Sequence, residues 1–277
     1  MSGGAAESAS DPFDPASFDS PLVNAIAPPL VGGLAILFRL SPFGFLLEGF
    51  HVWVHELGHA SVAWMTGRKA LPLPIGWTNV EQDRSMFVYA GVLLLLGTMA
   101  VAGWRERKAW PIVMAAALVP AQAYMTWVLP EDRGRMWMIF GGVGGEFAIA
   151  AAMMGLFYFE FPDGFRWGGC RYFFLFIGAA SFSETWAFWR DVKRGIEGIP
   201  YGSMIGGEDD GGGDMNILRD DYSWTQHQII HAYSHLGDVC LIALAVIYVF
   251  FNLRLDRVFD RLLARIWRVN PVSAGGD

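Results

Sequence analysis

The stretch "FHVWVHELGHASVAW", residues 50–64, decides how the rest of the chain is interpreted. It has the apolar character of a buried or membrane helix, yet it contains His51, His55, Glu56 and His59. Because a helix has about 3.6 residues per turn, positions four apart lie on one face. His55 and His59 therefore project together, with Glu56 beside that face. Two imidazoles placed in this way can bind one zinc ion through their ring nitrogens.

The order of these residues is the His-Glu-x-x-His pattern, in which two histidines bind zinc and the glutamate acts as a general base. Zinc lowers the pKa of its bound water to about 7. Glu56 would then take a proton as this water attacks a carbonyl group. Gly58 leaves room beside the metal. His51 lies one turn before His55 on the same face, and we expect it to hydrogen-bond a metal ligand or a neighbouring helix.

The context of the pattern strengthens the metal interpretation. Residues 44–66 carry five ionisable side chains, namely Glu48, His51, His55, Glu56 and His59. Each such group costs on the order of 2.5–3.5 kcal/mol at the centre of a bilayer. A metal ion in a polar cavity would supply the missing partner. The alternative is a polar seam that packs against other helices.

The remainder of the chain has the composition of a membrane protein. Of its 277 residues, 53% are hydrophobic and 17% are charged, whereas soluble domains carry about 25% charged residues. A membrane-spanning helix needs about 20 apolar residues. Segments that approach this length are residues 23–40, 44–66, 86–103, 109–129, 136–159, 172–189 and 229–251. We predict an all-α polytopic membrane protein with six or seven transmembrane helices, and a short extended segment after the metal-binding helix, at 71–83.

The domain organisation follows from the same pattern. Residues 1–20 are small and acidic and are predicted to be a disordered tail. Residues 21–251 form the membrane-embedded catalytic domain. Residues 252–277 contain an amphipathic helix, expected to lie on the lipid bilayer surface, and the C-terminal tail. The net charge of −7 and the lack of a basic stripe argue against a nucleic-acid partner.

A catalytic zinc ion usually has three protein ligands and one open position. The acidic candidates for the third ligand are Asp214, Glu146, Glu184 and Asp238. Asp214 follows glycines that allow the backbone to approach a site closely, although it could also be a solvated acid of its loop. Glu146 lies within a predicted span and could instead pair with a histidine. Periodicity alone does not choose among the four.

A second histidine ladder lies near the end of the chain. His227, His231 and His235 recur every four residues, with Asp238 three residues further on. The alternatives are a second metal site, a proton path, or polar packing against the first histidine face. In the last case His231 and His235, like His51 and Glu146, would hydrogen-bond the metal ligands.

Several motifs together resemble the site-2-protease class of intramembrane zinc metalloproteases. They are "HELGHA" at 55–60, "LPLPIGW" at 71–77, an apolar helix that opens near Tyr89-Ala90-Gly91, and a late aspartate in "GGGDMN". The resemblance covers roughly residues 44–218, and only the first motif is specific. The family's Asp-Gly pair is Asp214-Met215 here, and no peptide-binding domain is inserted, so the chain would be a minimal member.

The resemblance implies that His55, His59 and Asp214 bind zinc, that Glu56 is the base, and that the substrates are transmembrane segments of other proteins. Membrane depth also favours Asp214. His59 lies seven residues before Thr66, the end of its predicted span, so the metal should lie near that end of the helix. By alternation of spans, the loop that contains Asp214 emerges on the same side of the membrane. Glu146 lies in a span that enters from that side and could reach a similar depth, so it remains the competing ligand.

Two functions are consistent with these patterns. The first is a zinc-dependent intramembrane endopeptidase in the cytoplasmic membrane of a bacterium. The second is a metal-ion transporter or redox-metal membrane protein that uses the ladders 51/55/59 and 227/231/235. A transporter needs metal ligands but has no special need for an acid after the first histidine of a pair. Only the first ladder has that acid, Glu56, and this favours the protease.

Overall fold

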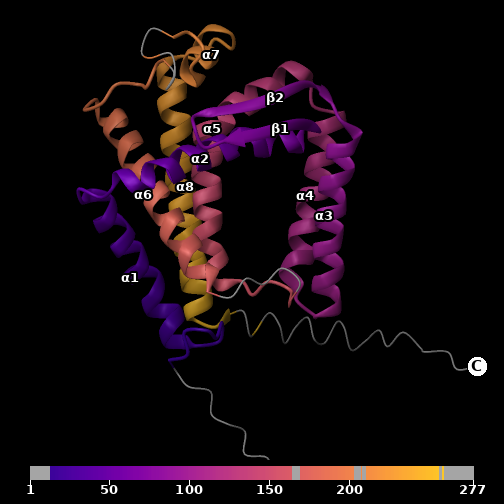
Figure 1. The fold of residues 1–277 in the computed structure, drawn as a ribbon, viewed down its shortest axis with the longest axis vertical. Coiled ribbons are helices and arrows are strands. Elements are labelled where there is room, and N and C mark those ends of the chain that lie inside the picture. The colour runs from indigo at the N-terminus through magenta and orange to yellow at the C-terminus, as the bar shows by residue number, and fades with distance from the viewer. Residues whose placement is uncertain (1–12, 164–168, 203–206, 208–209, 256–257, 259–277) are drawn as a thin grey trace, which may run out of the picture.

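The computed structural model describes residues 13–163, 169–202, 207, 210–255 and 258. Helices make up 73% of the structure, so the predicted helical class is confirmed. The elements in chain order are α1 (Pro21–Leu40), α2 (Phe45–Met65), β1 (Arg68–Leu73), β2 (Trp77–Arg84), α3 (Met86–Arg105), α4 (Ala109–Trp127), α5 (Glu131–Gly155), the 3₁₀ turn η1 (Leu156–Tyr158), α6 (Cys170–Arg194), α7 (Asp214–Asp220) and α8 (Gln226–Asn252) (Figure 1).

Five helices of the described residues are long and apolar enough to cross a membrane: α1, α3, α4, α5 continued through η1, and α8. This arrangement is compatible with a multi-pass membrane protein. The other two long helices, α2 and α6, also contain ionisable side chains, among them Glu48 and Glu56 in α2 and Glu184 in α6. That these two helices also cross the membrane, giving six or seven spans, stays a prediction.

The first helix contains two prolines without ending at them. Ser20 caps its N-terminus, since the Ser20 side chain accepts a hydrogen bond from the backbone nitrogen of Val23, and Pro21 occupies the first turn. Pro28 and Pro29 lie inside the helix, which continues to Leu40. The structure therefore has one uninterrupted helix over this apolar segment.

A two-stranded antiparallel sheet joins α2 to α3. The register pairs Arg68 with Arg84 and Pro72 with Thr78, and Gly76 adopts a positive φ of 78° in the turn between the strands. Figure 1 shows this hairpin at the same end of the helix bundle as α7. The segment of α2 that carries His59 leads directly into the hairpin, so this end of the molecule is where a site can form.

Helices α3 and α4 pack against each other and contact the remaining elements mainly through α2 and β1. Figure 1 shows the pair standing apart from α5, α6 and α8. Their outer surface is apolar, for example at Leu94, Val113 and Trp104, which are 60–69% exposed. Large exposed apolar surfaces are unfavourable in water and are expected for helices that face lipid.

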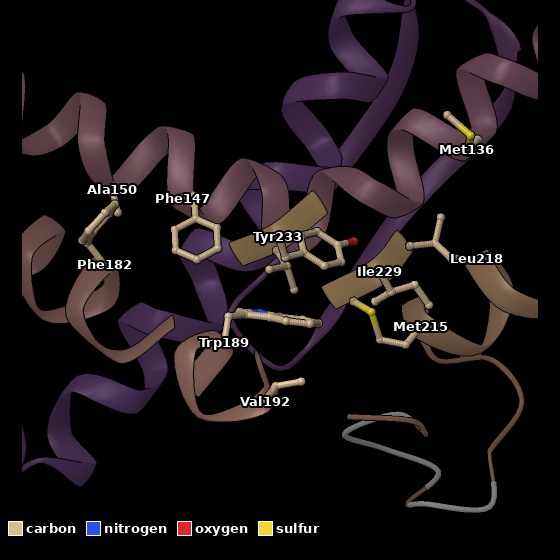
Figure 2. Packing of buried hydrophobic residues seen from close by; sticks show 11 residues of the cluster. Met136, Phe147, Ala150, Phe182, Trp189, Val192, Met215, Leu218, Ile229 and Tyr233 are labelled. Carbon is tan, nitrogen blue, oxygen red and sulfur yellow. The ribbon is translucent and has the colours of Figure 1, made fainter. Parts of the chain in front are cut away.

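The principal core lies between α5, α6, α7 and α8 (Figure 2). Its buried members are Met136, Val143, Phe147, Ala150, Phe182, Trp189, Val192, Met215, Leu218, Ile229 and Tyr233. The ring of Tyr233 lies between Phe140 and Trp189, with centroid distances of 4.9 and 4.7 Å. Met215 and Leu218 are the members from α7, and their burial fixes this short helix and its first residue, Asp214, against the bundle.

The predicted tails are described only in part. Within the predicted N-terminal tail, residues 13–20 lie against the start of α6, where Arg171 donates hydrogen bonds to the backbone oxygens of Pro15 and Ser17 at 2.5 and 3.1 Å. Residues 1–12 lie outside the described residues. Most of the predicted surface helix, from 259 onward, also lies outside them.

Candidate metal centre

The close contact between α2 and α5 depends on glycine. A Cβ atom at Gly58 would collide with the carbonyl oxygens of Gly141 and Gly142 and would lie 3.0 Å from the Cα of Gly145. Only glycine therefore allows the two backbones to approach this closely. The sequence led us to expect that Gly58 leaves room beside the metal, whereas in the structure its missing side chain makes room for the backbone of α5. The contact brings the histidine face of α2 directly onto α5.

Three ligand atoms from two distant segments converge beside this contact. His55 Nε2 lies 3.2 Å from His59 Nε2, and Asp214 Oδ2 lies 3.3 Å from the first and 3.2 Å from the second. All three side chains are largely buried, with 27%, 13% and 18% of their surfaces exposed. Among the described residues, this is the one group of histidine, cysteine and acidic side chains with metal-ligand spacing.

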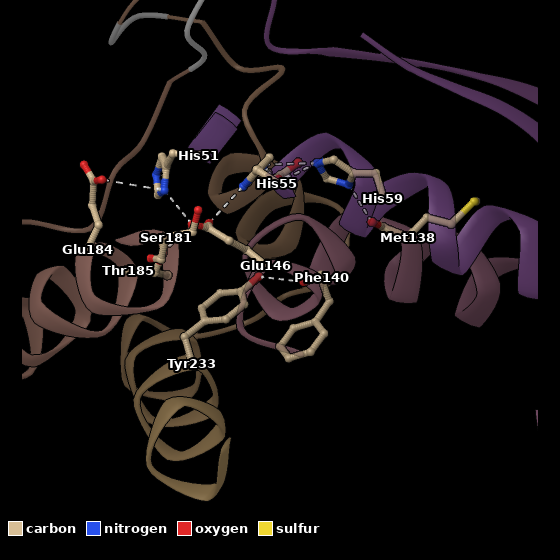
Figure 3. Close-up of polar contacts among 11 residues, drawn as sticks. His51, His55, His59, Met138, Phe140, Glu146, Ser181, Glu184, Thr185 and Tyr233 are labelled. Carbon is tan, nitrogen blue, oxygen red and sulfur yellow. Dashed lines mark hydrogen bonds and ion pairs between the residues drawn. The ribbon is translucent and has the colours of Figure 1, made fainter. Parts of the chain in front are cut away.

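Each histidine is held through its other ring nitrogen (Figure 3). His59 Nδ1 lies 2.7 Å from the backbone oxygen of Met138, and His55 Nδ1 lies 3.6 Å from Glu146 Oε2. A carbonyl oxygen only accepts, so His59 Nδ1 is the donor. In the neutral ring, Nε2 then carries a lone pair directed at the centre of the triangle. Anchoring of the distal nitrogen in this way is typical of metal-binding histidines.

Asp214 supplies the negative charge of the triangle. Its Oδ2 is buried and has no hydrogen-bond partner among the described residues. Burial opposes ionisation of this carboxyl group, but the neighbouring His59 and His55 outweigh burial and lower the pKa of Asp214. Its position matches the sequence expectation that the late aspartate returns to the two histidines.

The triangle fits a metal ion by size and by chemistry. Metal–ligand distances of about 2.0–2.1 Å place tetrahedral ligand atoms about 3.3–3.4 Å apart, close to the three observed separations. A Cβ atom at Gly142 would lie 2.5–2.6 Å from all three ligand atoms, so the absence of a side chain there leaves the space between them free. Three lone-pair donors cannot face one another without a positive charge. The group could therefore hold a metal ion.

Glu146 lies behind the triangle and is not a member of it. It is 2% exposed, and its Oε1 lies 2.7 Å from His51 Nδ1 and accepts a short hydrogen bond from Thr185. Glu184 is more distant, at 3.9 Å from His51. Of the two roles that the sequence left open for Glu146, the geometry matches the histidine partner (Figure 3).

Glu56 is buried and its carboxylate is held by the hairpin. Thr78 Oγ1 lies 2.5 Å from Glu56 Oε2 and 3.0 Å from the backbone oxygen of Glu56. A hydroxyl has one hydrogen, so it donates to one of these acceptors at a time. Thr78 is the contact that the sequence did not indicate, because the two residues are 22 positions apart and no spacing rule connects them.

The second histidine ladder lies elsewhere. His227, His231 and His235 are exposed on α8, and among the described residues none of them contacts the triangle. Their rings stack at centroid distances of 6.0 and 5.7 Å. Asp238 accepts a hydrogen bond from Trp186 at 3.3 Å. Packing of this ladder against the first histidine face is therefore not found.

Comparison of the chain with protein families, with curated proteins and with solved structures gave no match. The features that bear on function are thus those of this chain alone. They are the triangle of His55, His59 and Asp214, the adjacent Glu56, and the carboxylate of Glu146 behind His55.

Proposed function

We propose that this protein is a zinc-dependent intramembrane endopeptidase of the site-2-protease type, and that it cleaves transmembrane segments of membrane-protein substrates. The observation that carries the proposal is the triangle of His55, His59 and Asp214 with an acid directly after its first histidine. Three nitrogen and oxygen donors suit zinc and leave a fourth position open for a substrate or water. The apolar helices around the site support a membrane location, which we expect to be the bacterial cytoplasmic membrane.

The roles of the residues follow from the contacts. Zinc held by His55, His59 and Asp214 would supply Lewis-acid chemistry, which would polarise a carbonyl group and lower the pKa of water to about 7. Glu56 takes a proton from the attacking water and delivers it to the leaving amine nitrogen. Thr78 holds the carboxylate of Glu56. Glu146 and the backbone oxygen of Met138 orient the two histidine rings.

The separation of the two histidine ladders favours this function over the transporter alternative. A transport path needs successive ligand sets that lie along one route. Here the rings of α8 are exposed and, among the described residues, do not join the triangle. The second ladder also lacks an acid in the position that Glu56 occupies.

The test is a paired measurement of metal content and cleavage on the purified full-length chain. We expect about one zinc per chain. We also expect that Glu56→Gln retains the metal and lowers cleavage of a transmembrane peptide by about 10²–10⁴-fold, the usual effect of losing a general base. Full activity of this variant would refute the proposed mechanism. If the native chain cleaves no peptide and Glu56→Gln abolishes metal uptake into vesicles, the transporter function would be favoured.

A further inference from the structure

A buried arginine without an acidic partner lies at the hairpin end of the bundle. Arg68, the first residue of β1, is only 2% exposed. Its Nε donates a hydrogen bond to the backbone oxygen of Gln82 at 3.0 Å, and no carboxylate of the described residues forms an ion pair with it. Its Nη1 lies 3.6 Å from the position that a Cβ of Gly134 would take, so the guanidinium lies against the first turn of α5.

A second arginine is paired with the first across the sheet, next to an irregularity in the register between Arg68 and Ala70. Arg84 is the direct partner of Arg68 in the antiparallel register, and residues directly opposite each other project from the same face. The Nε of Arg84 is buried and has no hydrogen-bond partner among the described residues. Like charges directly opposite each other destabilise a sheet, so this pair needs a compensating group.

The nearby charges do not supply that compensation. Burial lowers the pKa of Arg68, and the positive charge of Arg84 lowers it further. Glu131 raises this pKa and Arg135 lowers it, so the single acid that acts on Arg68 is offset by a further arginine. Glu131 forms no ion pair with Arg68 or Arg84. A buried charge without a partner is strongly destabilising, and three guanidinium groups around one carboxylate leave a local excess of positive charge.

We propose that a phosphate group binds between Arg68 and Arg84, and that it is the anion which completes this cluster. Guanidinium groups bind phosphate oxygens in a planar, bidentate fashion, which lysine cannot do. The position also suits phosphate, because α3 begins at Met86 and α4 ends at Trp127 beside the hairpin. The ends of membrane helices lie near the lipid headgroups, where exposed aromatic residues such as Trp127 are common. The phosphate can come from a lipid headgroup or from free phosphate in solution.

The experiment measures phosphate binding by the full-length purified chain and by two matched variants. Arg84→Gln removes one guanidinium from the site. Lys69→Gln is the control: it removes the same charge from the adjacent residue, whose side chain is 53% exposed and pairs with Glu81 at 2.9 Å. Two probes are used, inorganic phosphate and phosphatidylglycerol in mixed micelles. The readouts are the thermal unfolding midpoint and the number of retained lipids by native mass spectrometry.

We expect Arg84→Gln to weaken binding about tenfold or more, because it removes charged hydrogen-bond donors from the site. Lys69→Gln should bind as the native chain does. Stabilisation by both probes would identify the phosphate group itself as the ligand. Stabilisation by phosphatidylglycerol alone would identify a lipid headgroup. If Arg84→Gln does not fold, Arg84→Lys is used instead. It keeps the positive charge but cannot bind two phosphate oxygens in the planar, bidentate way, so it should still weaken binding.

Two results would overturn the proposal. One is that neither probe stabilises the native chain. The other is an equal loss in Arg84→Gln and Lys69→Gln, which would indicate general electrostatic attraction. The proposal does not depend on the catalytic function, and zinc content measured in the same samples keeps the two questions separate.

Discussion

The two histidine ladders have the same spacing and different surroundings. In α2, the rings of His55 and His59 are turned to 76° from each other at a centroid distance of 4.9 Å, and both Nε2 atoms face one point. In α8, the rings of His231 and His235 stack at 29° and share no such point. The neighbouring helix α5 explains this difference in ring orientation. Only the first ladder has a backbone carbonyl and a carboxylate of α5 behind it to fix the ring orientation.

Two histidines four residues apart can therefore contribute to a metal site, but the spacing alone does not make one. A second element must orient the rings, and a third must supply an acidic ligand. Here α5 performs the first task through Met138 and Glu146, and α7 performs the second through Asp214. Mutations can test each part of this comparison.

The largest effect is expected from removing the ligands themselves. His55→Ala combined with His59→Ala should remove the metal completely and abolish cleavage, since one remaining carboxylate cannot hold the ion. The matched control, His231→Ala with His235→Ala, should retain the metal, because these rings are exposed and stacked. Metal analysis of the purified variants decides. Equal loss of metal from both double variants would show that both ladders contribute to metal binding.

A similarly large effect is expected from filling the space between the ligands. A Cβ in Gly142→Ala would lie 2.5–2.6 Å from the three ligand atoms, and we expect metal affinity to fall more than 100-fold, a change of about 3 kcal/mol. Gly97→Ala is the control, since nothing lies within 4 Å of a Cβ at this position in α3. Titration of the metal-free chains with zinc measures both. A Gly142→Ala chain with native affinity would place the metal elsewhere.

Residues of this site that are close in sequence could be predicted from helix geometry, whereas contacts between distant helices could not. The pair His55 and His59 followed from local helix geometry. Asp214 followed from the family resemblance together with membrane depth, because both segments had to reach one end of the bundle. A histidine partner for Glu146 was one of two alternatives from the sequence, which did not decide between them. An acid within a span indicates that some partner exists, but which one depends on the rotation of α5 against α2.

In the fold, too, the individual helices could be predicted and the contacts between them could not. Apolar length predicted the helices well, since burial or lipid exposure of a long apolar segment leaves few alternatives to a helix. The close contact between α2 and α5 depends on Gly58, Gly141 and Gly145, and no pattern in the sequence paired the first of these glycines with the other two. The cluster of Arg68 and Arg84 arises from strand register, which the extended pattern of 71–83 did not specify.

An intermediate effect is expected at the residue behind His55. Glu146→Gln removes the charge that faces His51 and His55 while it preserves the shape of the side chain. Loss of such a supporting group typically lowers metal affinity about 10–100-fold. Asp238→Asn is the control, because this acid of α8 pairs with Trp186 instead. Zinc titration of both variants tests this, and an unchanged affinity in Glu146→Gln would mean that the rings are held by helix packing alone.

The smallest effect is expected at the contact between the hairpin and the general base. Thr78→Val keeps the shape and removes the hydroxyl that contacts the carboxylate of Glu56 at 2.5 Å. A hydrogen bond to a charged group contributes about 1.5–3 kcal/mol, so cleavage should fall by roughly tenfold or somewhat more. The metal content should not change, because Thr78 does not contact the triangle.

Thr78→Ser provides the matched control for this role. It retains the hydroxyl and loses only a methyl group, and should therefore cleave at the native rate. If Thr78→Ser is as impaired as Thr78→Val, strand packing is the important contribution of this residue. If Thr78→Val instead has a native rate, the contact with Glu56 does not exist during turnover, and the hairpin must move away from α2 when substrate binds.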